Sequence, residues 1–365
     1  MQKILKGIDS LGEALKGSTK VFLVCDSSFP FLSIKNDIER MDVPYVAFDQ
    51  FTPNPLYEDV CKGVDLFQES NCDTILAIGG GSSLDVAKCI KLYCKMERDK
   101  LYLEQEYKDT CVKLIAIPTT AGTGSESTRY AVIYHDGKKQ SVTHDSIIPD
   151  VAILESKVLK TLPLYQKKCT MMDALCQGIE SWWSINSTDV SKEFSKKTIE
   201  LIVTNWEKYI FENNDESAAQ IMLAANYGGR AINITQTTAP HAMSYKITSL
   251  FGLPHGHAVA ICLPEIWEYM LTHTEKCVDL RGKDYISNVF KSIAKVLGYT
   301  TVQEAILFIR SMLTTMGLEH PKSTNCNNDL ETLTLSVNPT RLKNNPVSLN
   351  QETLRNIYRL IMKPL

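Results

Sequence analysis

The first 161 residues alternate short apolar runs with helix-length segments, and this alternation restricts the possible folds more than any other feature of the sequence. Runs of this length, rich in valine, isoleucine and phenylalanine, are typical of buried β-strands. Strands that alternate with helices favour a mainly parallel sheet with helices on both faces. We therefore predict an α/β domain over residues 1–161. Its expected strands are 21–25, 45–48, 74–78 and 113–117, with helices near 33–41 and 57–69.

The strand-like runs stop near residue 162, and the remainder consists of amphipathic segments of helix length. A chain of 365 residues exceeds the usual size of one hydrophobic core, so a second domain is expected on length alone. We predict an all-helical domain over residues 162–365, with loops at the Asn-rich or Pro-containing stretches 325–328 and 343–346. The expected helices are 168–183, 192–212, 217–232, 265–274, 285–297, 302–316 and 351–362.

Charge, hydropathy and cysteine spacing exclude several classes of function. The net charge is −3 and no basic run occurs, so neither nucleic acid nor an anionic membrane surface is an expected partner. No apolar stretch has the length of a signal peptide or a membrane span. The eleven cysteines are scattered without Cys-x-x-Cys spacing, and their number is odd. This pattern is typical of reduced thiols in a cytoplasmic protein and argues against a disulfide framework or a thiolate zinc site.

Two polar, glycine-containing stretches follow predicted strands. Gly79-Gly80-Gly81-Ser82 lies between a strand and a helix, where glycine permits close approach of a phosphate and the helix N–H groups attract anions. The stretch lacks both the Gly-x-Gly-x-x-Gly fingerprint and the Gly-Lys-Ser/Thr ending of a triphosphate-binding loop. A tight turn without a ligand is the alternative interpretation. Residues 119–125 add hydroxyl groups and glycines at the end of another predicted strand.

These two stretches are expected to face the same crevice, because ligands of open α/β sheets bind outside the carboxyl ends of the strands. Asp26 ends the first predicted strand. A carboxylate there can accept a hydrogen bond from the 2′-hydroxyl of an adenosine ribose and would repel a 2′-phosphate. We therefore predict NADH in preference to NADPH. The alternative for Asp26 is an ordinary helix cap or turn aspartate.

Asp173 and Gln177 are four residues apart in a largely apolar segment, so both side chains point the same way. A carboxylate directed into a core needs a partner, and a metal ion is one candidate. His241 and His255 bracket a Gly-Leu-Pro break, and two histidines brought together across a turn can hold one divalent ion. With the amide oxygen of Gln177, these groups suit Fe²⁺ or Zn²⁺. For a lone histidine, an ordinary core or surface position is the preferred interpretation.

As an ordered set, these motifs resemble the iron-containing, or group III, alcohol dehydrogenases. The resemblance rests on residues 79–88 and 118–126, on Asp173-Ala-Leu, and on the two histidines fourteen positions apart. It extends from about residue 20 to the C-terminus. It implies a Rossmann-like dinucleotide-binding domain, a helical domain, and one divalent metal ion in the cleft between them. NAD(H) as cofactor and assembly as a homodimer are expected with it.

The resemblance also assigns roles to single residues. Asp173, His241 and His255 are the implied metal ligands. The ion would polarise an aldehyde oxygen next to His255 while the reduced nicotinamide delivers hydride. The proton would come from Tyr245, which shares a helix face with His241, or from a hydroxyl relay or water. The implied cofactor contacts are Asn54, Gly80, Gly81, Ser82, Thr119, Thr120, Thr123 and Lys139.

Two positions depart from the family pattern. Gln177 stands where most members have a histidine ligand, so its amide oxygen either ligates weakly or leaves three protein ligands with water or substrate. Tyr245 replaces a further histidine near the nicotinamide. Both replacements, with residues 238–249 and 341–346, resemble the phosphonoacetaldehyde reductase branch. That branch reduces phosphonoacetaldehyde to 2-hydroxyethylphosphonate.

A phosphonate carries charge that needs cationic or N–H partners when it is buried. Arg230 and Lys246 are the candidates closest in sequence to the implied ligands, and each alone is equally well explained as a solvated surface cation. Lys88, Arg129 and Glu180 are expected to be structural. His257 is expected to be structural or to lie behind the ligands.

Three other functions fit parts of the sequence. A dehydrogenase of a small uncharged alcohol or polyol would use the same site. A dehydroquinate synthase-like lyase shares the general fold, NAD and a metal, but it needs clustered basic residues that have no clear place here. A non-catalytic binding protein is supported by Gln177 in place of a histidine. Metal analysis and NADH oxidation with a panel of aldehydes would separate all of these.

Overall fold

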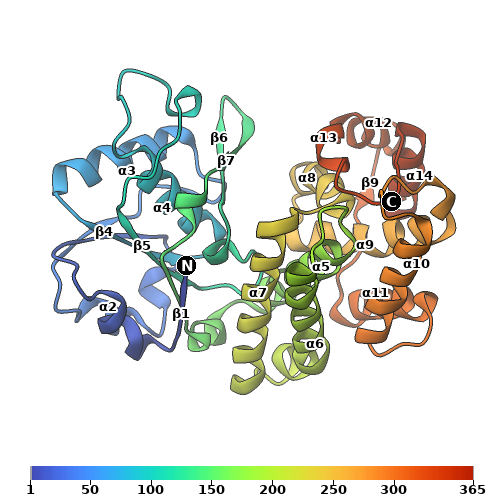
Figure 1. Ribbon diagram of the computed structural model, residues 1–365, viewed down its shortest axis with the longest axis horizontal. Helices are drawn as coiled ribbons and strands as arrows, with labels where there is room; N and C mark the ends of the chain where they lie inside the picture. Colours follow the sequence, from blue (N-terminus) through green and yellow to red (C-terminus); the bar gives the residue numbers. More distant parts are fainter. Residues whose placement is uncertain (1, 365) are drawn as a thin grey trace. The chain divides into compact units, whose positions relative to one another are not determined.

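The computed structural model describes residues 2–364, and they form two compact units (Figure 1). The first unit contains the chain up to Leu162 together with Phe211–Gly229. The second contains Pro163–Ile210 together with the chain from Arg230 onward. The division at residues 161 and 162 remains a prediction about domains, and the compact units differ from it in the segment Phe211–Gly229.

A six-stranded parallel sheet forms the centre of the first unit, in the strand order β1-β8-β5-β4-β2-β3. The α/β class expected from the alternation is confirmed, and all four expected strands are present. The sequence patterns missed β1 and β8, which have four residues each. The strands are β1 (Lys3–Lys6), β2 (Val21–Cys25), β3 (Tyr45–Phe48), β4 (Thr74–Gly79), β5 (Lys113–Pro118) and β8 (Val151–Leu154).

Helices α3 and α4 supply apolar side chains to the core of this unit. Val64 and Ile90, one from each helix, are fully buried in the same cluster as Phe22 from the sheet. Gly63 permits close packing of the two helices, since a Cβ there would lie 2.5 Å from Ile90 Cδ1. Burial of this surface is the main stabilising contribution to the unit. Its helices are α1 (Leu11–Ala14), α2 (Lys35–Glu39), α3 (Tyr57–Ser70) and α4 (Gly81–Tyr93), and α2 is shorter than the helix expected at 33–41.

An antiparallel hairpin, which the sequence patterns missed, packs on α4. It consists of β6 (Tyr130–His135) and β7 (Lys138–Thr143). The turn residues Asp136 and Gly137 both have positive φ, at 50° and 68°. This is the backbone of the two-residue hairpin turn that Asp-Gly favours. The dipeptide was therefore an available signal for the hairpin.

The second unit is largely helical, as expected. Helix α7 contributes to both units, which divide within it at residues 229 and 230. The remaining helices belong to the second unit, apart from the last residue of α6. They are α5 (Leu164–Trp183), α6 (Asp189–Phe211), α8 (Ala239–Phe251), α9 (His255–Thr272), α10 (Lys283–Val296), α11 (Val302–Met316), α12 (Cys326–Ser336), α13 (Pro339–Leu342) and α14 (Gln351–Ile361). Helix α7, which is shared, is Asp215–Thr235.

Three expectations for this half need correction. The helix expected at 265–274 is the second part of α9, which continues through Pro264 because the residues before it are fully buried and their packing outweighs the lost hydrogen bond. The loop expected at 325–328 is the first turn of α12. Two short strands, β9 (Lys322–Ser323) and β10 (Lys363–Pro364), pair in parallel where no strand was expected.

Two further findings concern membrane-spanning helices and disulfides. Among the described residues, no helix combines the length and the apolar character needed to cross a bilayer. All eleven cysteines lie in the described part of the chain and form no disulfide there.

Candidate metal centre and dinucleotide-binding loops

The loop between β4 and α4 has a backbone that only glycine can adopt. Gly79 has φ of 152°, and a Cβ there would lie 2.1 Å from Ser83 Oγ and 2.8 Å from Asp26 Oδ2. The sharp turn brings the start of α4 directly after the sheet. The free N–H groups of its first turn therefore lie at the carboxyl end of the strands, where a phosphate is favoured.

The stretch after β5 lies beside this loop. Thr119 N–H donates a hydrogen bond to the Gly79 carbonyl at 2.9 Å. A Cβ on Gly80 would lie 3.5 Å from Thr120 Cγ2, and one on Gly81 would lie 3.1 Å from Thr123 Cγ2. The two stretches are thus in contact, as the crevice hypothesis requires.

The structure brings most of the expected cofactor contacts to these loops. Asp26 Oδ2 accepts a hydrogen bond from Ser83 Oγ at 2.7 Å, so the carboxylate is held at the glycine loop. Asn54, with φ of 58°, donates its N–H to Ser82 Oγ at 3.3 Å. Lys139 lies on β7. Burial raises the pKa of Asp85, and the charges of Lys88 and, least of all, Lys139 oppose this shift. The roles of these expected contacts in cofactor binding stay predictions.

Buried hydrogen bonds of Lys88 and Asp85 hold the second loop in place. Lys88 Nζ donates to Ser125 Oγ at 2.9 Å and to the Tyr130 carbonyl at 2.8 Å. Burial lowers the pKa of Lys88 to about 8, although the charge of Asp85 opposes this shift. Asp85 accepts hydrogen bonds from Ser125 Oγ at 2.8 Å and Val132 N–H at 2.9 Å. These contacts fit the structural role expected for Lys88.

Asp173, His241 and His255 form one cluster in the second unit. Asp173 Oδ1 lies 3.3 Å from His241 Nε2 and 4.0 Å from His255 Nε2. One ligand atom from each of the three residues lies within 4.8 Å of the others. Asp173 and His241 are buried, whereas the His255 side chain is 37% exposed. The cluster is therefore accessible on the His255 side.

A glycine makes this meeting of three helices possible. Gly256 follows His255 at the start of α9, and a Cβ there would lie 2.0 Å from the Cys169 carbonyl oxygen of α5 and 3.0 Å from Asp173 Cβ. Gly252, with φ of 68°, ends α8 in the left-handed conformation and lets the chain return toward the same point. The contact between α5 and α9 thus fixes the position of His255 against Asp173.

Helix α5 presents three polar side chains on one face, because Asp173, Gln177 and Glu180 follow at i, i+4 and i+7. Gln177 Nε2 donates to Asp173 Oδ2 at 3.4 Å, so the amide is at the cluster. Glu180 Oε1 contacts His241 Nδ1 at 2.5 Å, and its Oε2 accepts from Thr238 N–H at 2.7 Å. Glu180 holds the ring of a cluster histidine, a role that the sequence analysis missed although the spacing was visible.

The position of His241 favours a positive charge. Burial by itself lowers the pKa of His241, but the charge of Glu180 and the hydrogen bond with Asp173 outweigh it and raise the pKa to about 9. Metal binding would replace the proton on Nε2 by a cation in the same place. One carboxylate and two imidazoles are ligands that Fe²⁺ and Zn²⁺ accept, so the residues present fit such an ion.

Tyr245 lies flat against the exposed ligand. Its ring stacks on the His255 ring with centroids 5.6 Å apart and an interplanar angle of 1°. On Tyr245 lies Arg341, whose Cζ is 5.0 Å from the ring centroid and whose Nη1 donates to the hydroxyl at 3.1 Å. In the sequence, Arg341 stands out only as the first residue of the stretch 341–346.

The two cations expected at a phosphonate have different surroundings. Arg230 lies with its Cζ 5.5 Å from the centroid of the Phe194 ring, and Lys246 is half-buried next to Tyr245 on α8. Both stay proposals.

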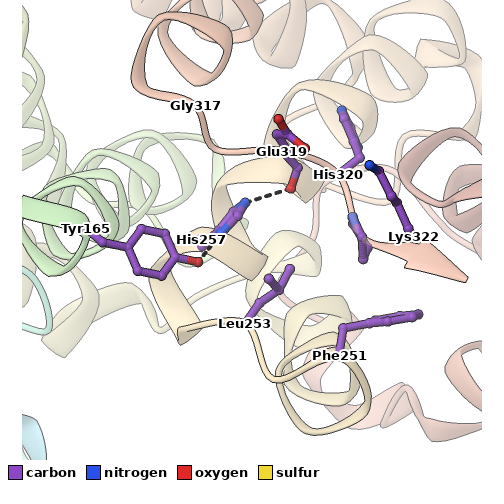
Figure 2. A pocket seen from close by; sticks show the side chains of 9 residues that line it. Tyr165, Phe251, Leu253, His257, Gly317, Glu319, His320 and Lys322 are labelled. Atoms are coloured by element: carbon purple, nitrogen blue, oxygen red, sulfur yellow. Dashed lines mark hydrogen bonds between the residues drawn. The ribbon is translucent and has the colours of Figure 1, made fainter.

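His257 is held away from the metal cluster. Its Nδ1 accepts from the Tyr165 hydroxyl at 2.8 Å, and its Nε2 contacts the Glu319 carbonyl at 2.9 Å (Figure 2). Burial lowers the pKa of His257, in keeping with a neutral ring. The ring lines a surface pocket of about 440 Å³ with His320 and Lys322 among its neighbours. His257 therefore has a structural position, as expected.

Comparison with known proteins identifies the family. Residues 4–156 match the family described as iron-containing alcohol dehydrogenase, and residues 168–362 match the C-terminal part of the Fe-containing alcohol dehydrogenase family. The two matches cover most of the chain in the order expected from the motifs. The chain belongs to the iron-containing alcohol dehydrogenase family.

Two curated relatives and one solved structure illustrate this family. EutG, a probable alcohol dehydrogenase of Escherichia coli strain K12, is 36% identical over 223 residues, which cover 59% of this chain and 56% of that protein. A phosphonoacetaldehyde reductase of Streptomyces viridochromogenes is 32% identical over 260 residues, covering 67% of this chain and 65% of that protein. The chain thus spans less than two thirds of either relative.

The solved structure is a sulfoacetaldehyde reductase from Bifidobacterium kashiwanohense in complex with NAD⁺. It superposes with a TM-score of 0.87 at 23% sequence identity, covering 99% of this chain and 96% of that chain. At this identity the likeness shows a shared fold.

Proposed function

We propose that the chain is a metal-dependent, NADH-linked reductase of a short aldehyde that carries an anionic group, with phosphonoacetaldehyde as the first candidate. The observation that carries the proposal is the cluster of Asp173, His241 and His255, which is buried on one side and accessible on the other. Asp173, His241 and His255 would hold one divalent ion, with Gln177 as a possible fourth ligand. When bound, that ion supplies a Lewis acid for the aldehyde oxygen.

The other side chains at the cluster prepare the site. Glu180 accepts a hydrogen bond from His241 Nδ1, and the Nε2 atom of the same ring is directed toward Asp173. This arrangement is typical of metal-binding histidines. His255 lies at the accessible side, where the substrate would enter. Tyr245, stacked on His255, has a hydroxyl that could deliver the proton needed by the product alcohol.

The hydride donor is proposed to be NADH. The glycine loop and the hydroxyl-rich loop have the close backbone approach that a pyrophosphate requires. Asp26 is held at the same loop, where it would favour a ribose 2′-hydroxyl over a 2′-phosphate. The NAD⁺ complex of the sulfoacetaldehyde reductase with this fold supports the same cofactor.

The anionic substrate is supported by two relatives. One is the phosphonoacetaldehyde reductase at 32% identity, and the other is the sulfoacetaldehyde reductase with the same fold. Both names describe a two-carbon aldehyde with a tetrahedral oxyanion. The similarity to EutG favours the second candidate function, a dehydrogenase of a small uncharged alcohol.

The test is NADH oxidation with phosphonoacetaldehyde, acetaldehyde and propanal by protein of known metal content. We expect turnover that requires a divalent ion and a higher kcat/KM for phosphonoacetaldehyde. Equal efficiency on charged and neutral aldehydes would favour the uncharged-alcohol dehydrogenase. Binding of NADH without turnover would favour a binding protein, and full activity in a thoroughly metal-stripped sample would refute the metal mechanism.

The expected homodimer and the cytoplasmic location are proposals that rest on the resemblance and on the reduced cysteines. Sedimentation of the purified chain would test the first. A monomer at all concentrations would contradict it.

A further inference from the structure

Next to the metal cluster, the side chains of His255, Tyr245 and Arg341 stack on one another in that order. The His255 ring lies against the Tyr245 ring, and the Arg341 guanidinium lies on Tyr245. Arg341 is thus two ring contacts from a metal ligand. The Tyr245 ring is therefore the group that separates this cation from the accessible side of the cluster.

The hydrogen-bonding capacity of Arg341 is largely unused. A guanidinium has five N–H donors, and among the described residues only one contact, from Nη1 to the Tyr245 hydroxyl, is formed. No carboxylate of the described residues lies within ion-pair distance of Arg341. Arg310, by contrast, is neutralised by Glu265 at 2.9 Å and Glu268 at 2.5 Å. Arg341 therefore presents a charge that the described part of the protein leaves uncompensated.

Hydrogen bonds of Asn344 fix the backbone near Arg341 to the residues that precede α8, the helix that carries His241. Asn344 Nδ2 donates to Gln236 Oε1 at 2.9 Å and to the Thr237 carbonyl at 3.2 Å. The Asn344 carbonyl in turn accepts from Ile185 N–H at 3.1 Å, just after α5. These bonds connect the Arg341 segment to the ends of α5 and α7 and to the residues that precede α8. The guanidinium is consequently placed by the same elements that place Asp173 and His241.

We propose that Arg341 is a specificity-determining residue that binds the oxyanion group of the aldehyde substrate. A planar guanidinium matches the paired oxygens of a phosphonate, sulfonate or carboxylate and binds them through two parallel hydrogen bonds. The contact with Tyr245 holds the guanidinium in place before the substrate arrives. The contacts favour Arg341 over Arg230, which lies on Phe194, and over Lys246, whose amino group stacks on no ring among the described residues. The inference rests on the proposed function, since it assumes that an aldehyde is bound at the metal cluster.

The experiment compares wild type with Arg341→Ala, Arg341→Gln and Arg341→Lys. For each, kcat and KM are measured with phosphonoacetaldehyde and with propanal at saturating NADH and equal metal content. Loss of the guanidinium should lower kcat/KM for phosphonoacetaldehyde about 10- to 100-fold, mainly through KM, as expected for lost charge-assisted hydrogen bonds. The value for propanal should change less than about threefold, because propanal has no group that binds Arg341. Arg341→Lys should keep part of the preference, since the charge remains but the paired geometry is lost.

Inhibition supplies a readout that is independent of turnover chemistry. Ethylphosphonate, ethanesulfonate and propionate should inhibit wild type in competition with the aldehyde, and the alanine and glutamine variants should resist all three. The order of the three inhibitors in wild type identifies the preferred oxyanion. Arg359→Ala is the matched control, because Arg359 is exposed on α14 and contacts only the side chain of Asn356 among the described residues.

The possible failures have different causes. Equal losses on phosphonoacetaldehyde and propanal would show that Arg341 only positions Tyr245, and would overturn the inference while the proposed function stands. A wild type that prefers phosphonoacetaldehyde and variants that keep this preference would do the same. A wild type that reduces propanal equally well, or that reduces no aldehyde, would overturn the proposed substrate or function itself and the inference with it.

Discussion

The two candidate sites are built by different means. In the first unit, the glycine loop and the hydroxyl-rich stretch are continuous segments that directly follow β4 and β5, and the register of the parallel strands sets them side by side. In the second unit, Asp173 lies on α5, whereas His241 and His255 lie on the consecutive helices α8 and α9, and packing of α9 on α5 joins the three residues. We therefore expect a change in backbone conformation to disturb binding at the first site, and a change in the distance between helices to disturb binding at the second.

Each candidate site contains one glycine position where a larger side chain would not fit. At Gly79 the obstacle to a side chain is the positive φ together with the side chains of Ser83 and Asp26. At Gly256 the obstacle is the backbone of α5, because the Cys169 carbonyl oxygen would lie 2.0 Å from a Cβ. A displaced side chain can adopt another rotamer, whereas a helix backbone must move as a body.

The largest effect is expected from removing the accessible ligand. His255→Ala should abolish turnover and metal retention, because the remaining pair, Asp173 and His241, cannot hold a divalent ion in a three-ligand site. Binding of NADH should persist, since the glycine loops belong to the other unit. The measurement is metal per chain, turnover and NADH titration on the same preparation. His273→Asn serves as the control, and loss of metal in that variant would contradict a specific role for His255.

The second prediction compares alanine substitutions at Gly256 and Gly79, which should weaken binding at different sites. Gly256→Ala should force α9 away from α5 and weaken metal binding while NADH binding remains, at a cost in stability of at least about 1–3 kcal/mol for overpacking. Gly79→Ala should do the reverse, because it distorts the turn after β4 and leaves the metal cluster untouched. Both variants are titrated with metal and with NADH, and their thermal unfolding is followed.

Gly12→Ala is the matched control for this pair, since among the described residues nothing lies within 4 Å of a Cβ at that position. It should leave both affinities unchanged. Joint loss of metal and NADH binding in either glycine variant would show that the two sites are not built independently.

The same contrast explains what the sequence could and could not predict. The loops 79–82 and 119–125 were predictable because each is one continuous stretch with its own strand and turn signals. The cluster histidines were predictable only as candidates, since nothing local places His255 beside Asp173. The contact that does so, between Gly256 and Cys169, joins residues 87 positions apart, and sequence patterns contain no distance of that kind.

Other residues were missed for reasons that differ. Glu180 lies two turns after Asp173 on the same helix face, so its role behind His241 could have been inferred from spacing. Arg341 could not, because its short helix α13 and the following loop reach Tyr245 through tertiary contacts alone. Pro264 argued for a helix break, and burial of the residues around it decided otherwise.

The third prediction concerns the partner behind a ligand. Glu180→Gln should weaken metal binding about 10- to 100-fold, as is typical when the carboxylate behind a metal-binding histidine is lost. The amide keeps the shape of the side chain but removes the charge that orients His241. Competition with a chelator of known affinity gives the measurement. Glu268→Gln, on the exposed part of α9, is the control, and equal losses in both variants would argue against the role of Glu180.

The fourth prediction concerns Asp26 in the first unit and the choice between NADH and NADPH. Asp26→Gly should narrow or reverse the preference for NADH over NADPH by about tenfold, or roughly 1.4 kcal/mol, with metal content unchanged. Asp26→Asn separates charge from hydrogen bonding, because the amide can still contact Ser83 without repelling a 2′-phosphate. The two cofactors are compared by kcat/KM at fixed aldehyde. A wild type that uses NADPH better would show that Asp26 does not contact the ribose.

The smallest effect is a pH dependence of stability that arises from Lys88 in the first unit. Burial lowers the pKa of Lys88 from 10.5 to about 8, so between these values the folded state has lost a proton that the unfolded state still binds. The free energy of unfolding should therefore rise with pH in that window, by at most about 1.4 kcal/mol per pH unit for one proton, and below pH 8 the cost of burying the charge is present in full. Cysteines and tyrosines with raised pKa values act in the opposite direction, so the informative quantity is the difference between wild type and Lys88→Met. The free energy of unfolding of wild type minus that of Lys88→Met should rise between pH 8 and 10. The rise should be the same with and without metal, because the proposed ion site is in the other unit. A difference that is flat between pH 8 and 10 would mean that the hydrogen bonds to Ser125, Thr128 and the Tyr130 carbonyl keep the ammonium charged despite its burial.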